Sequence, residues 1–318
     1  MIKLLGRLVV LAVMVLGTVL VQTLGDSQSW KLPWYLIHEL VLLAVPMAWL
    51  LVEVFPRAAR EEKLAFLCTS AIFVFLGSAF EIVAIQHRYW WFYTARDQLS
   101  GLTLGGVTIE EFLYYPLILN IPVLLYAWLV RRLPASPPGA PWSRGGKLLA
   151  RLLAGAALLG GLVLLVLAWR QTTPPLDLAV QPQPDASGTL RYAAGPPQHS
   201  WTIIQLLSLG VGLLAFVRLR SRLHRQAALL VLVLFVPYAF FLELMACGRG
   251  WWVWNARQVL GPFTGVLPVD SYLMYLTGAL LPVLCYVALL PFFAAPAGAL
   301  PAPRPPATGT TPPASTEP

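Results

Sequence analysis

Charged residues are scarce in this sequence. They make up 11% of its 318 residues, whereas hydrophobic residues make up 58%. Because a soluble domain carries about 25% charged residues, the composition excludes an ordinary soluble protein and predicts an integral membrane protein. The formal net charge is +8, but the basic residues occupy short loops between apolar runs, which argues against nucleic-acid binding.

Motifs for metal or cofactor chemistry are also missing. The three cysteines have no CxxC spacing and the four histidines are scattered, so no zinc site is predicted. There is no P-loop, HExxH or GxSxG motif. The stretch 210–215 matches a dinucleotide fingerprint only formally, because it lies inside an apolar run with no preceding strand. The lysines lie at the ends of apolar runs, which excludes a retinal Schiff base. We therefore expect no cofactor and no metal.

Long apolar runs dominate what the sequence does contain. Eight are long enough to cross a bilayer, which takes about 20 residues. They cover approximately 4–24, 34–55, 63–86, 108–130, 148–169, 201–219, 227–247 and 265–294. The predicted fold class is an all-α polytopic membrane protein with about eight transmembrane helices. Pro282 and Pro291 are expected to break the last run, and 295–318 reads as a disordered Pro-rich tail.

A cassette of acids, tryptophans and arginines occurs twice. Arg88, Trp90 and Arg96 recur at a constant spacing as Arg249, Trp251 and Arg257. Weaker likenesses extend over the flanking helices, so we expect a tandem repeat of two four-helix halves, 1–132 and 148–294, joined by a cytoplasmic linker, 133–147. The second half is longer because of a loop at 170–200, rich in Pro, Gln and Thr and expected to be irregular.

The distribution of basic residues predicts the orientation. Placing the N-terminus inside puts fifteen of the 22 Lys and Arg residues on the cytoplasmic side, so both termini are expected to be cytoplasmic. With four helices in each half, the halves run in the same direction, related by an axis along the membrane normal. Both cassettes then lie at the non-cytoplasmic end of the bundle. The expected location is the bacterial inner (cytoplasmic) membrane.

Acids at the edges of the apolar runs are the candidate catalytic residues, because a carboxylate in hydrocarbon is rare and marks a functional site. They are Glu81, Glu110, Glu111, Glu243 and Asp270. Structural roles compete with this interpretation. Glu81 and Glu243 could be interfacial acids or partners of Arg88 and Arg249. Thr108 and Glu111 match a capping box at the start of a helix, and Asp270 aligns with Glu110.

Aromatic residues beside these acids are the candidate substrate contacts. They are Trp90, Trp91, Tyr115, Trp251, Trp252 and Tyr275. Tyr115 follows Glu111 by four residues and Tyr275 follows Ser271 by four, which places each pair on one helix face. Tryptophans also gather at membrane interfaces, so the tryptophans of the cassettes, including Trp254, could instead form an interfacial belt.

The cassettes resemble the heterodimeric-type lycopene cyclase family, small membrane proteins of carotenoid biosynthesis that occur as two short subunits or one fused chain. The family pattern is an acid near a helix end, a Gly/Trp-rich turn, then Pro-x-Glu-Glu opening the next helix. The first half matches at Glu81, Trp90, Trp91, Glu110 and Glu111, and the second matches in part at Glu243, Trp251, Trp252, Pro268 and Asp270. Thr108 replaces the family's proline, and Ser271 replaces the second acid of the pair.

This resemblance implies a carotenoid cyclase that turns linear ends of lycopene or a related carotenoid into rings without redox change. A proton adds to a terminal alkene, a neighbouring double bond attacks the cation, and a proton is lost. Glu110 or Glu111 would be the general acid/base with Glu81 in support, and Glu243 and Asp270 would play the corresponding roles. Indole rings stabilise cations by about 0.5–2 kcal/mol each. The expected partners are an apolar isoprenoid and membrane lipid.

Other functions compete with the cyclase. A carotenoid end-group hydratase, or a cyclase for prenylated carotenoids, would use nearly the same residues. A non-enzymatic carotenoid or lipid carrier, or a membrane scaffold, is a further alternative. An intramembrane protease of the Glu-Glu type is disfavoured, because Phe112-Leu-Tyr-Tyr-Pro116 follows the two acids in place of the expected arginine and histidines. The sequence does not predict an oligomeric state.

Overall fold

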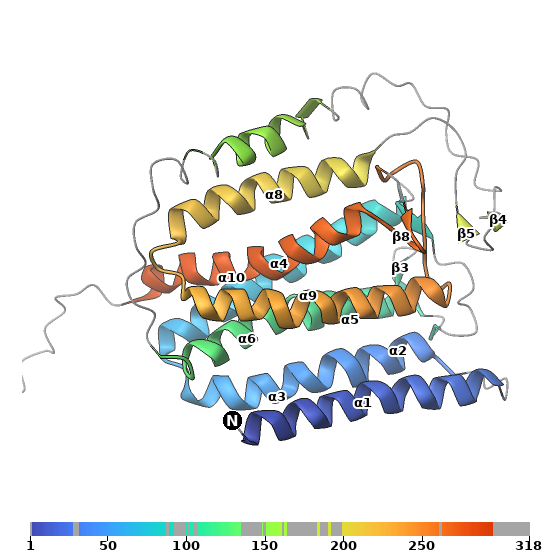
Figure 1. Cartoon of the computed structure of the whole chain (residues 1–318), viewed down its shortest axis with the longest axis horizontal. Helices are drawn as coiled ribbons and strands as arrows, with labels where there is room; N and C mark the ends of the chain where they lie inside the picture. Colours follow the sequence, from blue (N-terminus) through green and yellow to red (C-terminus); the bar gives the residue numbers. More distant parts are fainter. Residues whose placement is uncertain are drawn as a thin grey trace, which may run out of the picture.

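The protein folds into a bundle of roughly antiparallel helices (Figure 1). A computed structural model describes residues 2–27, 32–86, 89–91, 99–100, 102–104, 107–134, 148, 151–160, 162–163, 183–184, 190–191, 199–260 and 263–294. The predicted linker from residue 135, most of the loop 170–200 and the predicted tail 295–318 lie outside the described residues. The described chain is mostly helical, as the apolar runs predict.

Six helical segments of the described chain are long and apolar enough to cross a membrane. They are Trp34–Arg57, Arg60–Ile85, Ile109–Val130, Ser200–Leu219, Arg225–Gly248 and Asp270–Phe293. The first and fifth predicted runs contain the shorter apolar helices Ala12–Gly25 and Arg151–Gly160. A polytopic helical membrane protein is therefore supported, whereas eight spans in two four-helix halves stays a prediction.

The first half of the chain, where it is described, contains six helices with short irregular turns between some of them. Its helices are α1 (Ile2–Ser27), α2 (Trp34–His38), α3 (Val45–Val54), α4 (Arg60–Gln86), α5 (Ile109–Ile118) and α6 (Asn120–Val130). A π-helical turn, Glu39–Ala44, joins α2 to α3, and a 3-10 turn, Phe55–Arg57, follows α3. Single π turns are rare and often occur at functional sites.

The junction of α5 and α6 is also irregular. Pro116 lies inside α5 and Pro122 inside α6, and proline removes a backbone donor from the helical ladder. The side-chain amide of Asn120 donates to the Pro116 carbonyl at 2.7 Å and to Ser70 Oγ on α4 at 2.9 Å. This junction therefore ties α5 and α6 to α4.

Three long helices form the second half: α8 (Ser200–Leu219), α9 (Arg225–Gly248) and α10 (Asp270–Phe293). The prediction that the last helix begins near 265 is wrong, because residues 263–268 form a hairpin and α10 begins at Asp270. The expectation that proline breaks this helix is also wrong. α10 continues through Pro282 and Pro291, since packing of a buried segment outweighs the loss of one hydrogen bond per proline.

Short antiparallel strand pairs, which the sequence did not predict, connect the helices. The pairs are β1 (Trp90–Trp91) with β6 (Val253–Trp254), β2 (Thr103–Leu104) with β3 (Val107–Thr108), β4 (Gln183–Pro184) with β5 (Leu190–Arg191), and β7 (Phe263–Thr264) with β8 (Leu267–Pro268). The β4–β5 pair lies in the loop expected to be irregular. The β1–β6 pair links the two halves of the chain directly.

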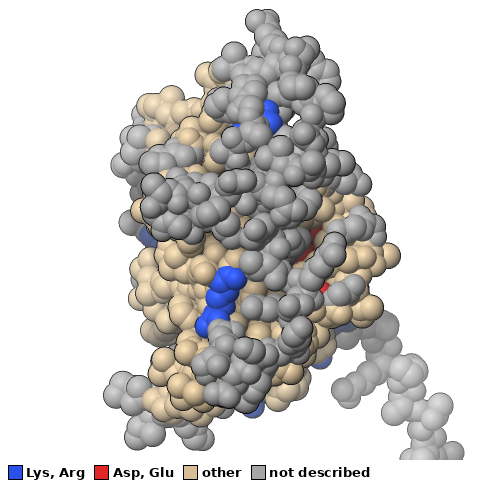
Figure 2. Space-filling view, turned by 90° about the vertical axis from the view of Figure 1, so that its right-hand side faces the viewer, with Lys and Arg blue, Asp and Glu red and all other residues tan. Residues whose placement is uncertain are grey.

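The end of the bundle that carries β1, β3, β6 and β8, on the right in Figure 1, is the cassette end. Figure 2 faces this end, and only a small area of Asp and Glu is visible on it. This agrees with the burial of Glu81, Glu110, Glu111, Glu243 and Asp270. Both cassettes lie together at one end, as the sequence predicts.

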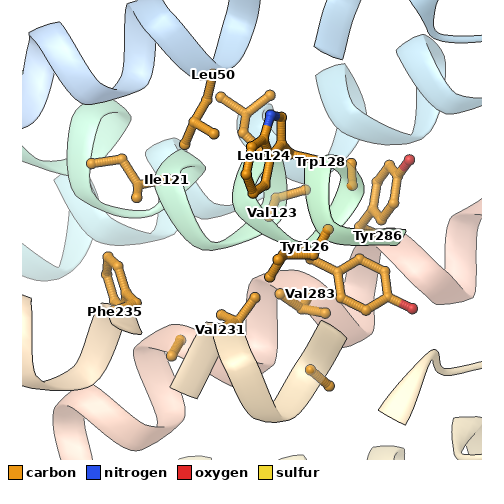
Figure 3. Packing of buried hydrophobic residues seen from close by; sticks show 14 of the residues in the cluster. Leu50, Ile121, Val123, Leu124, Tyr126, Trp128, Val231, Phe235, Val283 and Tyr286 are labelled. Carbon is orange, nitrogen blue, oxygen red and sulfur yellow. The ribbon is translucent and has the colours of Figure 1, made fainter. Parts of the chain in front are cut away.

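The main apolar core fills the rest of the bundle between α3, α6, α9 and α10. Figure 3 shows part of it, with Leu124 of α6 on the side of Leu50 of α3, and Val123 and Tyr126 of α6 on the side of Val231 of α9 and Val283 of α10. At the end opposite the cassettes, the Tyr126 hydroxyl accepts a hydrogen bond from the backbone N–H of His224 at 2.9 Å. Arg131 and Arg132 pair there with Glu62 and Glu53, at 2.6 and 2.7 Å. We name this the basic end.

Candidate active site

A buried aromatic cluster occupies the cassette end. Trp90, Trp251, Trp252 and Trp254 are only 8%, 1%, 9% and 4% exposed, so these tryptophans do not form an interfacial belt. The ring of Trp90 packs edge-on against Trp254, with centroids 5.3 Å apart. Burial also raises the pKa of the neighbouring Tyr89 hydroxyl, which keeps it neutral. The cluster surrounds the ends of α4 and α9 with polarisable ring surface.

Glu81 lies near the end of α4 and is fully buried. Its Oε1 accepts a hydrogen bond from the indole N–H of Trp90 at 3.0 Å, and its Oε2 accepts one from the Tyr115 hydroxyl at 2.7 Å. Both donors are neutral groups. The contacts place the Glu81 carboxyl at one fixed point between α4, β1 and α5.

Glu243 has the corresponding position near the end of α9. Its Oε1 accepts hydrogen bonds from the indole N–H groups of Trp252 and Trp254, both at 3.1 Å, and from Cys247 Sγ at 3.7 Å. The Tyr275 hydroxyl is buried beside Glu243. Trp254, which sequence reasoning assigned only to a belt, is therefore a direct partner of a candidate catalytic acid.

The two indole contacts correct the pairing of the cassettes. Trp90 donates to Glu81, nine residues before it, and Trp252 donates to Glu243, also nine residues before it. The sequence pairing of Trp90 with Trp251 is therefore one residue out of register. Trp252 is the residue in the second half that makes the contact made by Trp90 in the first.

Glu111 faces the interior of the bundle from the first turn of α5. Its Oε1 accepts a hydrogen bond from the Tyr35 hydroxyl of α2 at 2.5 Å. The predicted capping box is not formed, although Thr108 does occupy the N-cap position. Its hydroxyl makes no capping hydrogen bond and has no partner among the described groups, and the Glu111 carboxyl is turned toward Tyr35.

Glu110 and Asp270 make a different kind of contact. Glu110 Oε1 accepts a hydrogen bond from the backbone N–H of Ser100 at 2.5 Å, and Asp270 Oδ2 accepts one from the backbone N–H of Leu260 at 2.6 Å. Asp270 Oδ2 also accepts from Thr202 Oγ1 at 2.7 Å. The predicted alignment of these two acids thus has a structural counterpart, since each anchors the backbone ten residues before it.

An apolar cavity of about 440 Å³ collects most of the candidate residues, and its volume is typical of ligand pockets. It is lined by Phe73, Leu76, Gly77, Phe80, Glu81, Trp90, Glu111, Tyr114, Tyr115, Leu119, Trp201, Ile204, Gln205, Ser208, Glu243, Trp252, Trp254, Met274 and Leu281. Three carboxyl groups therefore face one aromatic and aliphatic cavity, between α4, α5, α8, α9 and α10.

Four predicted site residues whose side chains are described are not part of this lining. They are Glu110, Asp270, Tyr275 and Trp251, of which Trp251 lines a separate small cavity of about 20 Å³. The backbone of Trp91 pairs with Val253, but its side chain lies outside the described residues. The structure thus separates the adjacent acids Glu110 and Glu111, which the sequence could not rank.

Glu39 is a buried acid that sequence reasoning missed. It is 2% exposed, it opens the π-helical turn after α2, and neither of its carboxyl oxygens has a hydrogen-bond partner among the described groups. It lines the 20 Å³ cavity with Tyr35, Tyr114 and Glu243, and this space is large enough for about one water molecule. The feature of the sequence that could have pointed to Glu39 is the presence of an acid inside the apolar run 34–55.

Fold and site together define a class of protein: a helical membrane protein with buried carboxyl groups around an apolar, tryptophan-rich cavity. Among the described residues, no group of His, Cys, Asp and Glu side chains is arranged to hold a metal ion. The family model described as lycopene cyclase matches residues 32–129 and 198–290, more than half of the chain. The chain belongs to the lycopene cyclase family, with one matched segment in each half. No curated protein and no solved structure gave a significant match.

Proposed function

We propose that this protein is a carotenoid cyclase that converts linear ends of lycopene or a related carotenoid into rings by acid/base chemistry within the membrane. The observation that carries the proposal is the 440 Å³ cavity, where Glu81, Glu111 and Glu243 face an apolar space bounded by indole rings. Membership of the lycopene cyclase family supports the carotenoid substrate. An apolar substrate reaches such a cavity from the lipid, where it is already dissolved.

Glu111 is the proposed proton donor. A carboxyl group held away from water favours its neutral form, and among the described residues Glu111 accepts a hydrogen bond from one side chain, Tyr35. Its second oxygen is available to place a proton on the terminal alkene. The resulting tertiary cation is attacked by the neighbouring double bond, which closes the ring and moves the positive charge onto a ring carbon.

Glu81 and Glu243 are the proposed stabilisers of that cation and acceptors of its proton. Each accepts hydrogen bonds from two neutral O–H or indole N–H donors, which hold its carboxyl oxygens in fixed positions at the cavity wall. Trp90, Trp252 and Trp254 supply ring faces next to the cation. Loss of one ring proton to a carboxylate forms the new double bond, so the substrate neither gains nor loses atoms.

Glu110 and Asp270 are proposed as positioning residues and not as proton carriers. Their carboxyl groups bind the backbone at Ser100 and Leu260 and do not line the cavity. Each fixes the loop that precedes its own helix. Glu110 thereby sets the start of α5, from which Glu111 projects.

A tandem repeat of two four-helix halves is the proposed architecture, with halves 1–132 and 148–294, a linker at 133–147 and a tail at 295–318. The hairpins β2–β3 and β7–β8 have the same form and the same place before α5 and α10, which supports this. We further propose that both termini are cytoplasmic and that the bilayer is a bacterial inner membrane. The arginines gathered at the basic end support this orientation.

Expression in a lycopene-accumulating host, followed by chromatography of the pigments, tests the function. Wild type is expected to form cyclic carotenoids, and Glu111→Gln is expected to lower ring formation about 10²–10⁴-fold, the usual contribution of a general acid. Glu61→Gln makes the same chemical change at the first turn of α4, at the basic end, and is expected to retain wild-type ring formation. Full activity of Glu111→Gln, or hydroxylated products in place of rings, would contradict the proposal.

A further inference from the structure

A second apolar cavity extends from the site toward the basic end. Its volume is about 420 Å³, and it lies between α8, α9 and α10. Its lining residues are Leu209, Gly212, Leu213, Phe216, Leu223, Arg225, Ala228, Leu229, Leu232, Leu276, Thr277, Leu280 and Leu281. We call it the α8–α10 groove. Among the described residues that line it, none has a carboxyl group and only Arg225, at the far end, is charged.

The groove adjoins the cavity of about 440 Å³ in the candidate active site, which we call the reaction cavity. Leu281 of α10 lines both spaces. On α8 the lining passes from Trp201 and Ser208 in the reaction cavity to Gly212 and Phe216 in the groove, at the spacing of a single helix face. From Trp201 to Phe216 this face is about 22 Å long, at 1.5 Å per residue.

We propose that the α8–α10 groove holds the part of the linear carotenoid that is not being cyclised. This inference rests on the proposed function. A carotenoid is a long, rigid and wholly apolar chain, and only its end group reacts. With that end beside Glu81 and Glu111, the remainder needs an apolar path away from the acids. The groove begins at the cavity wall, has nearly the same volume as the cavity, and runs along the membrane-spanning direction of α8.

Gly212 lines the groove beside Leu281, the residue shared by both spaces, and we call this point the passage. A Cβ atom at this position would lie 3.3 Å from Cδ2 of Leu281, so even alanine would touch the residue shared by both cavities. A leucine at position 212 would fill the passage. Gly278 of α10 offers a matched control, because a Cβ there would meet nothing within 4 Å and Gly278 lines neither cavity.

The test compares binding of two ligands to the purified full-length protein, measured by quenching of tryptophan fluorescence. One ligand is lycopene, and the other is a half-length acyclic isoprenoid hydrocarbon with the same end group. Gly212→Leu is expected to weaken lycopene binding at least tenfold and to leave binding of the short ligand within about twofold. Gly278→Leu is expected to leave the binding of both ligands unchanged. Leu213→Trp, which fills the groove beyond the passage, is expected to reproduce the selectivity of Gly212→Leu.

The proposal would be overturned if Gly212→Leu and Leu213→Trp weakened the binding of both ligands equally, or if neither variant weakened the binding of lycopene. It would also be overturned if wild-type protein bound no lycopene. Turnover, measured on the same samples, separates the two proposals. Wild-type protein that binds lycopene with the expected selectivity but forms no ring would support the groove and refute the cyclase.

Discussion

Gly77 of α4 allows the ring of Tyr115 to lie against the helix backbone, and Gly77→Ala would displace that ring. A Cβ atom at position 77 would lie 2.3 Å from Cδ1 and 2.7 Å from Cγ of Tyr115, whereas ordinary contacts begin at 3.4 Å. The ring must therefore move by about 1 Å. Tyr115 lines the cavity and donates the 2.7 Å hydrogen bond to Glu81, so the displacement reaches a proposed catalytic carboxylate.

Two effects of Gly77→Ala follow from this geometry. Overpacking of this kind usually costs about 1–3 kcal/mol of stability, and a misplacement of about 1 Å at a catalytic group can cost about 10²-fold in rate. We therefore expect a lower thermal unfolding midpoint in detergent and a ten- to hundredfold loss of ring formation. Gly278→Ala is the control, because its new methyl group meets nothing within 4 Å.

The double variant identifies how the displacement acts. Tyr115→Phe keeps the ring and removes the hydroxyl, so Gly77→Ala is expected to cost less activity in that background than in wild type. Equal activity of Gly77→Ala and Gly278→Ala would show that the position of Tyr115 does not matter to the reaction. That result would refute the proposed role of Tyr115 in placing Glu81.

Two further predictions concern buried acids outside the main cavity. Asp270→Ala removes the acceptor for Leu260 N and Thr202 Oγ1 and is expected to lower the free energy of unfolding by about 1–3 kcal/mol. Asp270→Asn keeps an acceptor oxygen and is expected to lose less stability. Equal melting midpoints of the two variants would refute the anchoring role of Asp270. Glu39→Leu removes two buried carboxyl oxygens that have no partner among the described groups, so it is expected to raise the melting midpoint, and a lower midpoint would show that the buried carboxyl group stabilises the fold.

Hydropathy located six helices that are long and apolar enough to cross a membrane, because apolar length decides which segments can cross a bilayer. It also identified Glu81 and Glu243, since an acid at the end of a hydrophobic run is conspicuous. Glu39 was not identified from the sequence, because the position of a single acid within an apolar run does not show whether its side chain faces lipid, water or a buried space. The π-helical turn that turns this residue inward has no signature in the sequence.

Glu110 and Glu111 show what a local pattern leaves open. Adjacent residues on an α-helix point about 100° apart, and a local pattern does not decide which of the two faces the cavity; the packing partners decide it. Tyr35 on α2 and the backbone of Ser100 make that choice, and both lie outside the local motif. The pairing of Trp90 with Trp254 is likewise a contact between halves, which a comparison of the cassettes could not foresee.

Deuterium incorporation tests the central claim most directly, because protonation of an alkene by a buried carboxyl group leaves a permanent mark in the product. Purified protein in D2O is incubated with unlabelled lycopene, and the cyclic product is analysed by mass spectrometry. The account predicts one deuterium atom for each ring formed, and in ordinary water a product of unchanged mass relative to lycopene. Rings without deuterium, or a product whose mass in ordinary water differs from that of lycopene, would contradict it.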